Sequence, residues 1–226
     1  MLLIESNQLV KNYKNDKLTI EVLKGINLKL EQGEFLSILG PSGSGKTTLL
    51  YCLSGLEPYS NGSIKLFNQE LKNFKEKEIA KLRQTKIGFV FQFYNLIPNL
   101  TVYENVLLAC IIAKKANHDS VNQVLEQVGL SQFKDYYPNQ LSGGMQQRVS
   151  IARALVNDPE ILFADEPIGN LDHHNGLAIM ELFQKLNKEH GKTIILVTHN
   201  EEMIKYGTRF IRLIDGEIVN DEYLSN

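Results

Sequence analysis

The chain has 226 residues, 43% of them hydrophobic, which suffices for one large domain with a sizeable core. Its formal net charge of −2 gives no electrostatic basis for binding nucleic acid or an anionic membrane. The longest strictly apolar run, residues 106–113, is less than half of the ~20 residues that a membrane-spanning helix needs. The N-terminus also lacks the features of a signal peptide. We therefore expect a soluble protein, so that any role at a membrane comes through a partner.

The two cysteines, Cys52 and Cys110, lie far apart and outside any Cys-x-x-Cys pattern. Both fall in apolar stretches, so we expect them to be small buried hydrophobic residues. The sequence therefore predicts neither a zinc site nor a disulfide, in keeping with a reducing compartment.

The N-terminal part of the chain predicts short strands over residues 2–4, 19–23 and 26–30, separated by turns rich in Asn, Lys and Asp. Tyr13 lies in the first of these turns, residues 11–15. An aromatic ring there could stack on a nucleobase, although a lone Tyr is more often an ordinary surface residue.

An apolar strand over residues 35–39 leads into a loop rich in Gly and Ser, which is followed by a run that can start a helix at Thr48. The loop consists of Gly40, Pro41, Ser42, Gly43, Ser44, Gly45, Lys46 and Thr47. This is the P-loop pattern, whose backbone N–H groups hold phosphate oxygens. Lys46 would reach the β- and γ-phosphates, and the Thr47 hydroxyl would bind Mg²⁺. The alternative is a Gly/Ser loop that carries a Lys by chance.

The middle of the chain predicts a half-buried strand over residues 63–67, a charged helix over 75–83 and a buried strand over 87–91 that ends at Gln92. A polar side chain at the end of a buried strand often faces a site, but it can equally be bound by water. Residues 93–159 are expected to be mostly helical. Their helices begin near the capping box at Thr101, near Asp119, and after residues 141–144.

The last of these helix starts carries the sequence Leu-Ser-Gly-Gly, with Ser142, Gly143 and Gly144. Such a start offers free N–H groups and a hydroxyl to an anion. A well-capped helix without a ligand is the alternative.

A strand over residues 160–164 delivers Asp165 and Glu166 at its carboxyl end. Asp165 could lie beside Mg²⁺ held by Thr47, and Glu166 could polarise a water for attack on the γ-phosphate. Without a P-loop, the same pair would equally suit a turn or a helix start.

The C-terminal part predicts a helix from about residue 177, a buried strand over 193–197 that ends at Thr198 and His199, and a strand pair over 209–214 and 217–219. Buried strands that alternate with helices indicate a parallel α/β sheet. The candidate residues Gly40, Gln92, Asp165 and His199 all follow strand carboxyl ends, where such sheets bind ligands.

These motifs together resemble those of the ATP-binding-cassette (ABC) ATPases, in the family's order and over nearly the whole chain. LSGGMQQR at residues 141–148 resembles the signature motif, which is far more specific than a P-loop. GPSGSGKTT at 40–48 and ILFADEP at 161–167 resemble Walker A and Walker B. Gln92 matches the Q-loop, residues 170–172 the D-loop, His199 the switch histidine and Tyr13 the A-loop.

Within the family, residues 88–92, 98–106 and 164–172 resemble one branch most closely. This branch contains the macrolide-exporter, lipoprotein-releasing, cell-division and bacitracin-resistance type ATPases. Ile168 departs from it, because Thr is usual there, and we expect a small effect since the carboxylates and Asp172 are intact.

The resemblance implies an α/β fold with a P-loop NTPase core, a mostly parallel sheet, an N-terminal antiparallel β subdomain and a helical subdomain. Residues 1–226 would form a single ABC ATPase domain, with the catalytic core over 1–92 and 159–226 and the helical subdomain over 93–158.

The resemblance also implies an ATPase that uses ATP and Mg²⁺, with Thr47, Gln92 and Asp165 at the metal. The catalytic residues would be Glu166, His199, Lys46 and Gln92. Two copies would pair head to tail, so that the P-loop residues and Tyr13 of one copy and the signature loop of the other enclose each ATP. Asp172 would help to link the two sites.

The leading functional hypothesis is the ATPase subunit of a bacterial ABC transporter, located on the cytoplasmic face of the membrane beneath separate permease subunits. It would export or extract a peptide, antibiotic or lipid-linked substrate. The alternative is a mechanotransmission complex that regulates cell-wall enzymes without moving a solute. A soluble ABC ATPase in DNA repair or translation is disfavoured, because the chain has no coiled-coil insertion, second cassette or basic bias. The adjacent pair His173 and His174 predicts solvated residues at a helix start.

Overall fold

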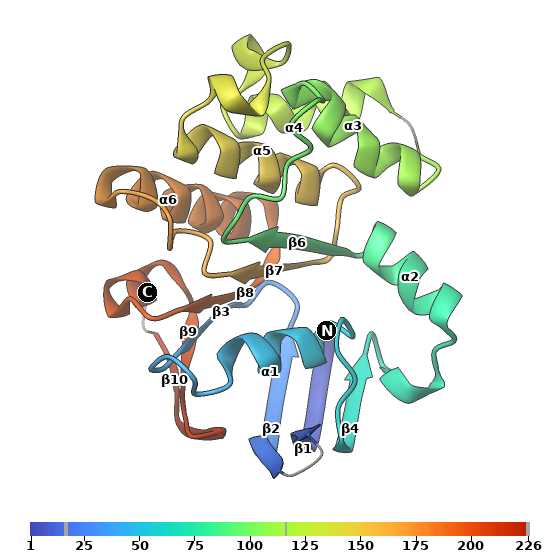
Figure 1. The fold of residues 1–226 in the computed structure, drawn as a ribbon, viewed down its shortest axis with the longest axis vertical. Coiled ribbons are helices and arrows are strands. Elements are labelled where there is room, and N and C mark those ends of the chain that lie inside the picture. The colour runs from blue at the N-terminus through green and yellow to red at the C-terminus, as the bar shows by residue number, and fades with distance from the viewer. Residues whose placement is uncertain (16–17, 116, 225–226) are drawn as a thin grey trace.

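The computed structural model describes residues 1–15, 18–115 and 117–224 (Figure 1). Its larger sheet has six strands in the order β10-β9-β3-β8-β7-β6. Five of them run parallel to one another: β3 (Phe35–Leu39), β6 (Ile87–Phe91), β7 (Ile161–Asp165), β8 (Thr193–Thr198) and β9 (Arg209–Ile214). Only β10 (Glu217–Tyr223) runs antiparallel to its neighbour. The prediction of an α/β fold with a mostly parallel sheet is confirmed.

A second, antiparallel sheet is built mainly by the N-terminal part of the chain. Its strands are β1 (Leu2–Asn15), β2 (Leu18–Glu31), β4 (Asn61–Leu66) and β5 (Gln69–Glu70), in the order β2-β1-β4-β5. The N-terminal antiparallel unit expected from the sequence is therefore present.

The first two strands are much longer than predicted. Each spans 14 residues, and the two segments 19–23 and 26–30 belong to the single strand β2. Gly25, with φ of 77°, lies at an irregularity in the pairing of β2 with β1. A Gly between two apolar segments indicates a turn, which is why the sequence predicts two strands. The predicted turn at residues 11–15 is wrong, because cross-strand pairing continues through polar residues and matches Tyr13 with Ile20.

Six α-helices lie among the described residues: α1 (Lys46–Leu53), α2 (Glu76–Thr85), α3 (Val102–Ile112), α4 (His118–Gln127), α5 (Gly143–Leu155) and α6 (His173–His190). Short 3₁₀ turns cover Leu71–Asn73, Ser131–Phe133, Pro138–Gln140 and Glu201–Tyr206. The capping box at Thr101 is confirmed, with Glu104 as its partner. The helix expected from about residue 177 begins at His173, because Asp172 caps it by accepting a hydrogen bond from the Asn175 N–H.

The larger sheet separates two hydrophobic cores. Helix α1 lies between the two sheets, whereas α5 and α6 cover the other face of the larger sheet, with α3 and α4 beyond α5 (Figure 1). Cys52 and Cys110 are 0% and 1% exposed, so the prediction that they are buried is confirmed. Among the helices described, none is long and apolar enough to cross a membrane. The division into a core and a helical subdomain stays a prediction.

Candidate functional site

The loop between β3 and α1 forms one wall of a cavity of about 300 Å³. The cavity is lined by Val22, Ser42, Gly43, Gly45, Lys46, Thr47, Thr48, Glu166 and His199. Glycine is required at two places in this loop. A Cβ on Gly40 would lie 2.1 Å from the Leu213 carbonyl oxygen, and one on Gly45 would lie 2.9 Å from that of Val22. The loop therefore packs its backbone tightly against the strands behind it, with the start of α1 facing the cavity.

Lys46 is held close to the loop from which it projects. Its Nζ donates hydrogen bonds to the carbonyl oxygens of Gly40, at 2.9 Å, and Pro41, at 2.8 Å. Burial lowers the pKa of Lys46, and the nearby carboxylates of Glu166 and Asp165 oppose that change. The ammonium group has three N–H donors, so one remains for a ligand in the cavity.

Asp165, at the carboxyl end of β7, is held by two residues of α1. Thr47 Oγ1 donates to Asp165 Oδ1 at 2.9 Å, and the Tyr51 hydroxyl donates to Oδ2 at 2.9 Å. Burial and the hydrogen bond to Asp165 raise the pKa of Tyr51 to about 12. A hydroxyl and a carboxylate are oxygen ligands of the kind that Mg²⁺ prefers, so this pair fits a metal bound beside phosphate.

Glu166 turns away from Asp165 and toward His199. Glu166 Oε2 lies 2.9 Å from His199 Nδ1, and both residues line the cavity. The Glu166 backbone adopts a φ of 47°, a left-handed conformation that is uncommon for a residue with a side chain. The structure thus brings together a carboxylate and an imidazole that can accept and hold a proton beside the phosphate loop.

Gln92 follows β6, as predicted, but its side chain does not line the cavity. The Gln92 side-chain Nε2 donates to Asn170 Oδ1 at 3.2 Å, and the Gln92 backbone carbonyl oxygen accepts from Asn170 Nδ2 at 3.1 Å. In this conformation Gln92 is therefore linked to the D-loop, and contact with a metal would require its amide to turn.

Tyr13 is 40% exposed and does not line the phosphate cavity. The buried Lys11 lies under its ring, with Nζ 4.6 Å from the ring centroid, and pairs with Glu57 at 2.9 Å. Burial and a hydrogen bond to Glu57 raise the pKa of Tyr13. Thr48, in the first turn of the P-loop helix, opposes this rise, so the ring lies close to that helix.

The signature loop begins α5. Ser142 caps the helix by accepting a hydrogen bond from the Met145 N–H at 3.3 Å. A Cβ on Gly144 would lie 2.7 Å from Asn175 Oδ1, and one on Gly143 would lie 2.9 Å from the Tyr94 hydroxyl. Helices α5 and α1 lie on opposite faces of the larger sheet (Figure 1), and the lining of the phosphate cavity contains none of the signature residues. One chain does not bring these two motifs together.

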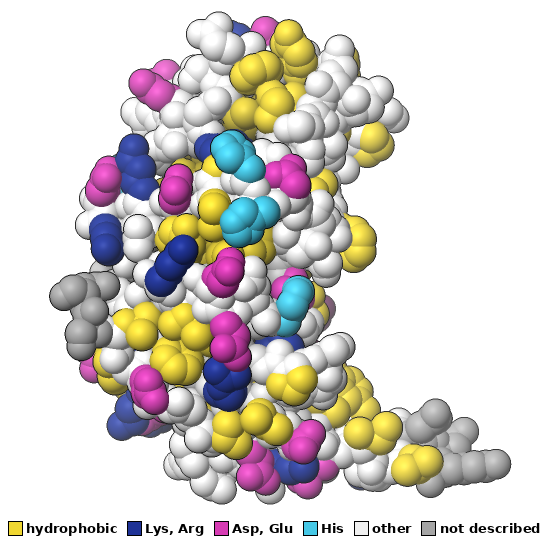
Figure 2. All heavy atoms as spheres, turned by 90° about the vertical axis from the view of Figure 1, so that its left-hand side faces the viewer, with side chains coloured by type: hydrophobic (Ala, Val, Ile, Leu, Met, Phe, Trp, Pro, Cys, Tyr) yellow, Lys and Arg dark blue, Asp and Glu magenta, His cyan; other side chains and the backbone are white. Residues whose placement is uncertain are grey.

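A second cavity, of about 200 Å³, shares His199 with the first and is also lined by Asp172 and His173. Hydrogen bonds from the backbone and side chain of Asn175 lower the pKa of Asp172. His173 and His174 are exposed at the start of α6, as predicted. Figure 2 shows histidine side chains on one face of the molecule close to acidic ones.

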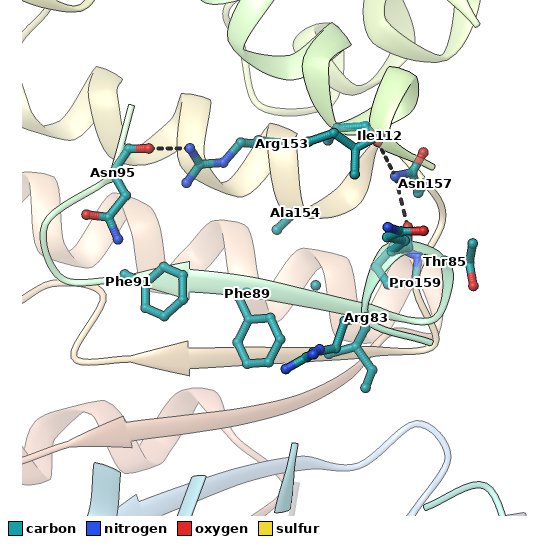
Figure 3. A pocket seen from close by; sticks show the side chains of 14 residues that line it. Arg83, Thr85, Phe89, Phe91, Asn95, Ile112, Arg153, Ala154, Asn157 and Pro159 are labelled. Atoms are coloured by element: carbon teal, nitrogen blue, oxygen red, sulfur yellow. Dashed lines mark hydrogen bonds between the residues drawn. The ribbon is translucent and has the colours of Figure 1, made fainter. Parts of the chain in front are cut away.

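A groove of about 380 Å³ lies along the edge strand β6, where residues of α2, α3 and α5 also line it (Figure 3). Phe89 and Phe91 of β6 form its floor, and Ile112 of α3 and Arg153 of α5 form its walls. The Arg153 guanidinium donates to the carbonyl oxygens of Tyr94 and Asn95 and has no carboxylate partner among the described residues. This groove could not be predicted from the sequence, because its residues come from separate segments of the chain.

Comparisons with known proteins agree with the motifs. A family model described as ABC transporter matches residues 23–169. The bacitracin export ATP-binding protein BceA of Halalkalibacterium halodurans is 45% identical over 221 residues, which cover 96% of this chain and 87% of that protein. The lipoprotein-releasing system ATP-binding protein LolD of Cytophaga hutchinsonii is 45% identical over 204 residues, which cover 89% of this chain and 93% of that protein.

A solved dimeric structure of the ATP-binding cassette MJ0796, in a post-hydrolysis state bound to ADP and Pi, has the same fold. Its TM-score is 0.90 at 42% identity, with 99% of this chain and 100% of that chain covered. The phosphate loop, the two carboxylates of β7 and the signature start of α5 lie in matched segments. This chain therefore belongs to the ABC transporter family, as one of its ATP-hydrolysing cassettes.

Proposed function

We propose that this chain is the ATPase subunit of an ABC exporter and acts as a head-to-tail dimer on the cytoplasmic face of the membrane, beneath separate membrane subunits. The observation that carries the catalytic part is the Glu166–His199 pair, 2.9 Å apart, in the wall of the cavity that Lys46 and Thr47 also line. A proton acceptor next to a phosphate cradle is what ATP hydrolysis requires.

In this proposal the triphosphate lies against the P-loop N–H groups, with the third donor of Lys46 on a phosphate oxygen. Thr47 and Asp165 would hold Mg²⁺, which neutralises charge on the β- and γ-phosphates, and Gln92 would join them. Glu166 would take a proton from the attacking water. Meanwhile the bond between the water oxygen and the γ-phosphorus would form, and the bond between the γ-phosphorus and the ADP oxygen would break. His199 would orient Glu166 and contact the γ-phosphate.

The signature loop would complete the site of a second copy. Ser142, Gly143 and Gly144 would offer N–H groups and a hydroxyl to the γ-phosphate held by the partner's P-loop. Two observations support this: α5 begins on the opposite face of the sheet from α1 (Figure 1), and MJ0796, a cassette with the same fold, has been solved as a dimer.

The groove in Figure 3 would receive the membrane subunits. Its floor of Phe89 and Phe91 offers apolar contact, and Arg153 offers a cation with no carboxylate partner among the described residues. Those features suit a short amphipathic segment with an acidic residue. Asn95, in the segment that follows β6, also lines the groove.

The catalytic assignment is tested by Glu166→Gln. The variant should bind ATP normally and turn it over roughly 10²–10⁴ times more slowly, the usual contribution of a general base. Glu160→Gln, at the other end of β7 and paired with Lys86, is the matched control and should hydrolyse ATP at the wild-type rate. Turnover of Glu166→Gln within a few-fold of wild type would refute the role of Glu166.

The names of the relatives support a peptide, antibiotic or lipid-linked substrate. The test is to reconstitute the chain with the membrane protein that copurifies with it in proteoliposomes. Substrate-stimulated ATPase with movement of that substrate supports export. ATPase that depends on the membrane protein but moves no solute would instead support mechanotransmission.

A further inference from the structure

Tyr51 is a residue of α1 that no motif of the sequence includes, yet it contacts the candidate metal site. Asp165 accepts one hydrogen bond at each carboxylate oxygen, from Thr47 and from Tyr51, each at 2.9 Å. The two donors are four residues apart, so they project from the same face of the helix. A carboxylate bound at both oxygens cannot rotate without losing a bond.

Tyr51 is held at the end of α1 by backbone hydrogen bonds and by the packing of its ring against the hydrophobic core between the two sheets. The Tyr51 carbonyl oxygen accepts hydrogen bonds from Ser54 Oγ at 3.1 Å and from the N–H groups of Leu56, at 2.9 Å, and Glu57, at 3.1 Å. The ring is also half-buried. The hydroxyl is therefore a fixed donor, in contrast to a mobile surface tyrosine.

We propose that Tyr51 is a positioning residue that holds Asp165 in the orientation in which it and Thr47 share Mg²⁺; this inference rests on the proposed function. The Thr47 hydroxyl can donate its proton to Asp165 and still offer a lone pair to a cation. With Oδ2 occupied by Tyr51, the carboxylate keeps Oδ1 beside the Thr47 oxygen. Groups that orient metal ligands in this way commonly change metal affinity by about 10–100-fold when they are removed.

The test is Tyr51→Phe, which removes only the hydroxyl. Calorimetry would measure the affinity for ADP without metal and the affinity for Mg²⁺ in the presence of saturating ADP. We expect unchanged ADP affinity and Mg²⁺ affinity that is about 10–100-fold weaker. Replacement of Tyr51 by 4-aminophenylalanine, which restores a donor at the same place, should recover Mg²⁺ affinity. Tyr136→Phe, on an exposed ring in the segment after α4, should match wild type in both measurements.

Wild-type Mg²⁺ affinity in Tyr51→Phe would overturn this inference alone. Loss of metal-free ADP affinity in the same variant would also overturn it, because the hydroxyl would then support α1 and the P-loop as a whole. A wild-type chain that binds no Mg²⁺ with ADP would overturn the proposed function, and this inference with it.

Discussion

Asp165 and Glu166 are adjacent in the sequence but take different partners, because the backbone changes conformation between them. Asp165 ends a strand and faces Thr47 and Tyr51, whereas Glu166 has a φ of 47° and faces His199. The sequence predicted both carboxylates from their position after a buried strand. It could not predict the bond from Tyr51, since an aromatic residue in an apolar helix typically packs in a core.

The prediction at this scale concerns Tyr13, the proposed adenine platform. Lys11 lies on one side of its ring, so the other face remains for a base. Tyr13→Ala should weaken ATP binding about 5- to 150-fold, the equivalent of the ~1–3 kcal/mol that base–aromatic stacking contributes. The affinity for inorganic tripolyphosphate, which has no base, should not change. Equilibrium binding of both ligands checks this.

Tyr13→Phe keeps the ring and is the matched control, which should bind ATP almost as tightly as wild type. If Tyr13→Ala weakened ATP and tripolyphosphate equally, the ring would be supporting the P-loop through Thr48 and would not be stacking on adenine.

At the scale of elements, the predictions from buried apolar runs and of the C-terminal strand pair are confirmed, whereas the strand bounds and the turn predicted at the N-terminus are wrong. Strands β3, β6, β7 and β8 lie within a residue of their predicted ranges, because continuous apolar residues mark strands buried on both faces. Strands β1 and β2 extend beyond their apolar parts, where backbone pairing holds polar residues that resemble a turn in the sequence.

The groove between β6 and α3 offers a prediction with a close control on the same helix. Ile111 and Ile112 are each 53% exposed, but only Ile112 lines the groove. Ile112→Glu introduces a charge into the groove that Phe89 and Phe91 also line, and should prevent copurification of the membrane subunit from detergent-solubilised membranes. ATP affinity should stay at the wild-type value, because the P-loop is untouched. Ile111→Glu adds the same charge outside the groove and should copurify normally.

Equal recovery of the membrane subunit by both variants would show that the groove is not the docking site. Loss of the subunit by both variants would instead indicate that the exposed side of α3 carries the contact.

In the proposed dimer, each molecule presents two half-sites on different faces. The P-loop, Asp165, Glu166 and His199 meet at one edge of the sheet, because parallel strands deliver their carboxyl ends there. The signature residues cap α5 on the other side (Figure 1). Each motif could be predicted from the sequence alone, because each is a short local pattern. The sheet topology, however, keeps the P-loop and the signature residues of one chain apart. In the proposed site they come together only when a second copy is present.

The most direct test of this central claim is the molar mass in solution, measured by light scattering with saturating ATP in Glu166→Gln, which should retain ATP unhydrolysed. We predict the mass of two chains with ATP and of one chain without it. Adding Ser142→Arg to Glu166→Gln should keep the protein monomeric with ATP bound, because the bulk and charge of Arg enter the proposed interface. Adding Ser131→Arg instead, at another exposed position, should leave the ATP-dependent dimer intact. A single-chain mass for Glu166→Gln with ATP, or an ATP-dependent dimer of the Ser142→Arg double variant, would contradict the account.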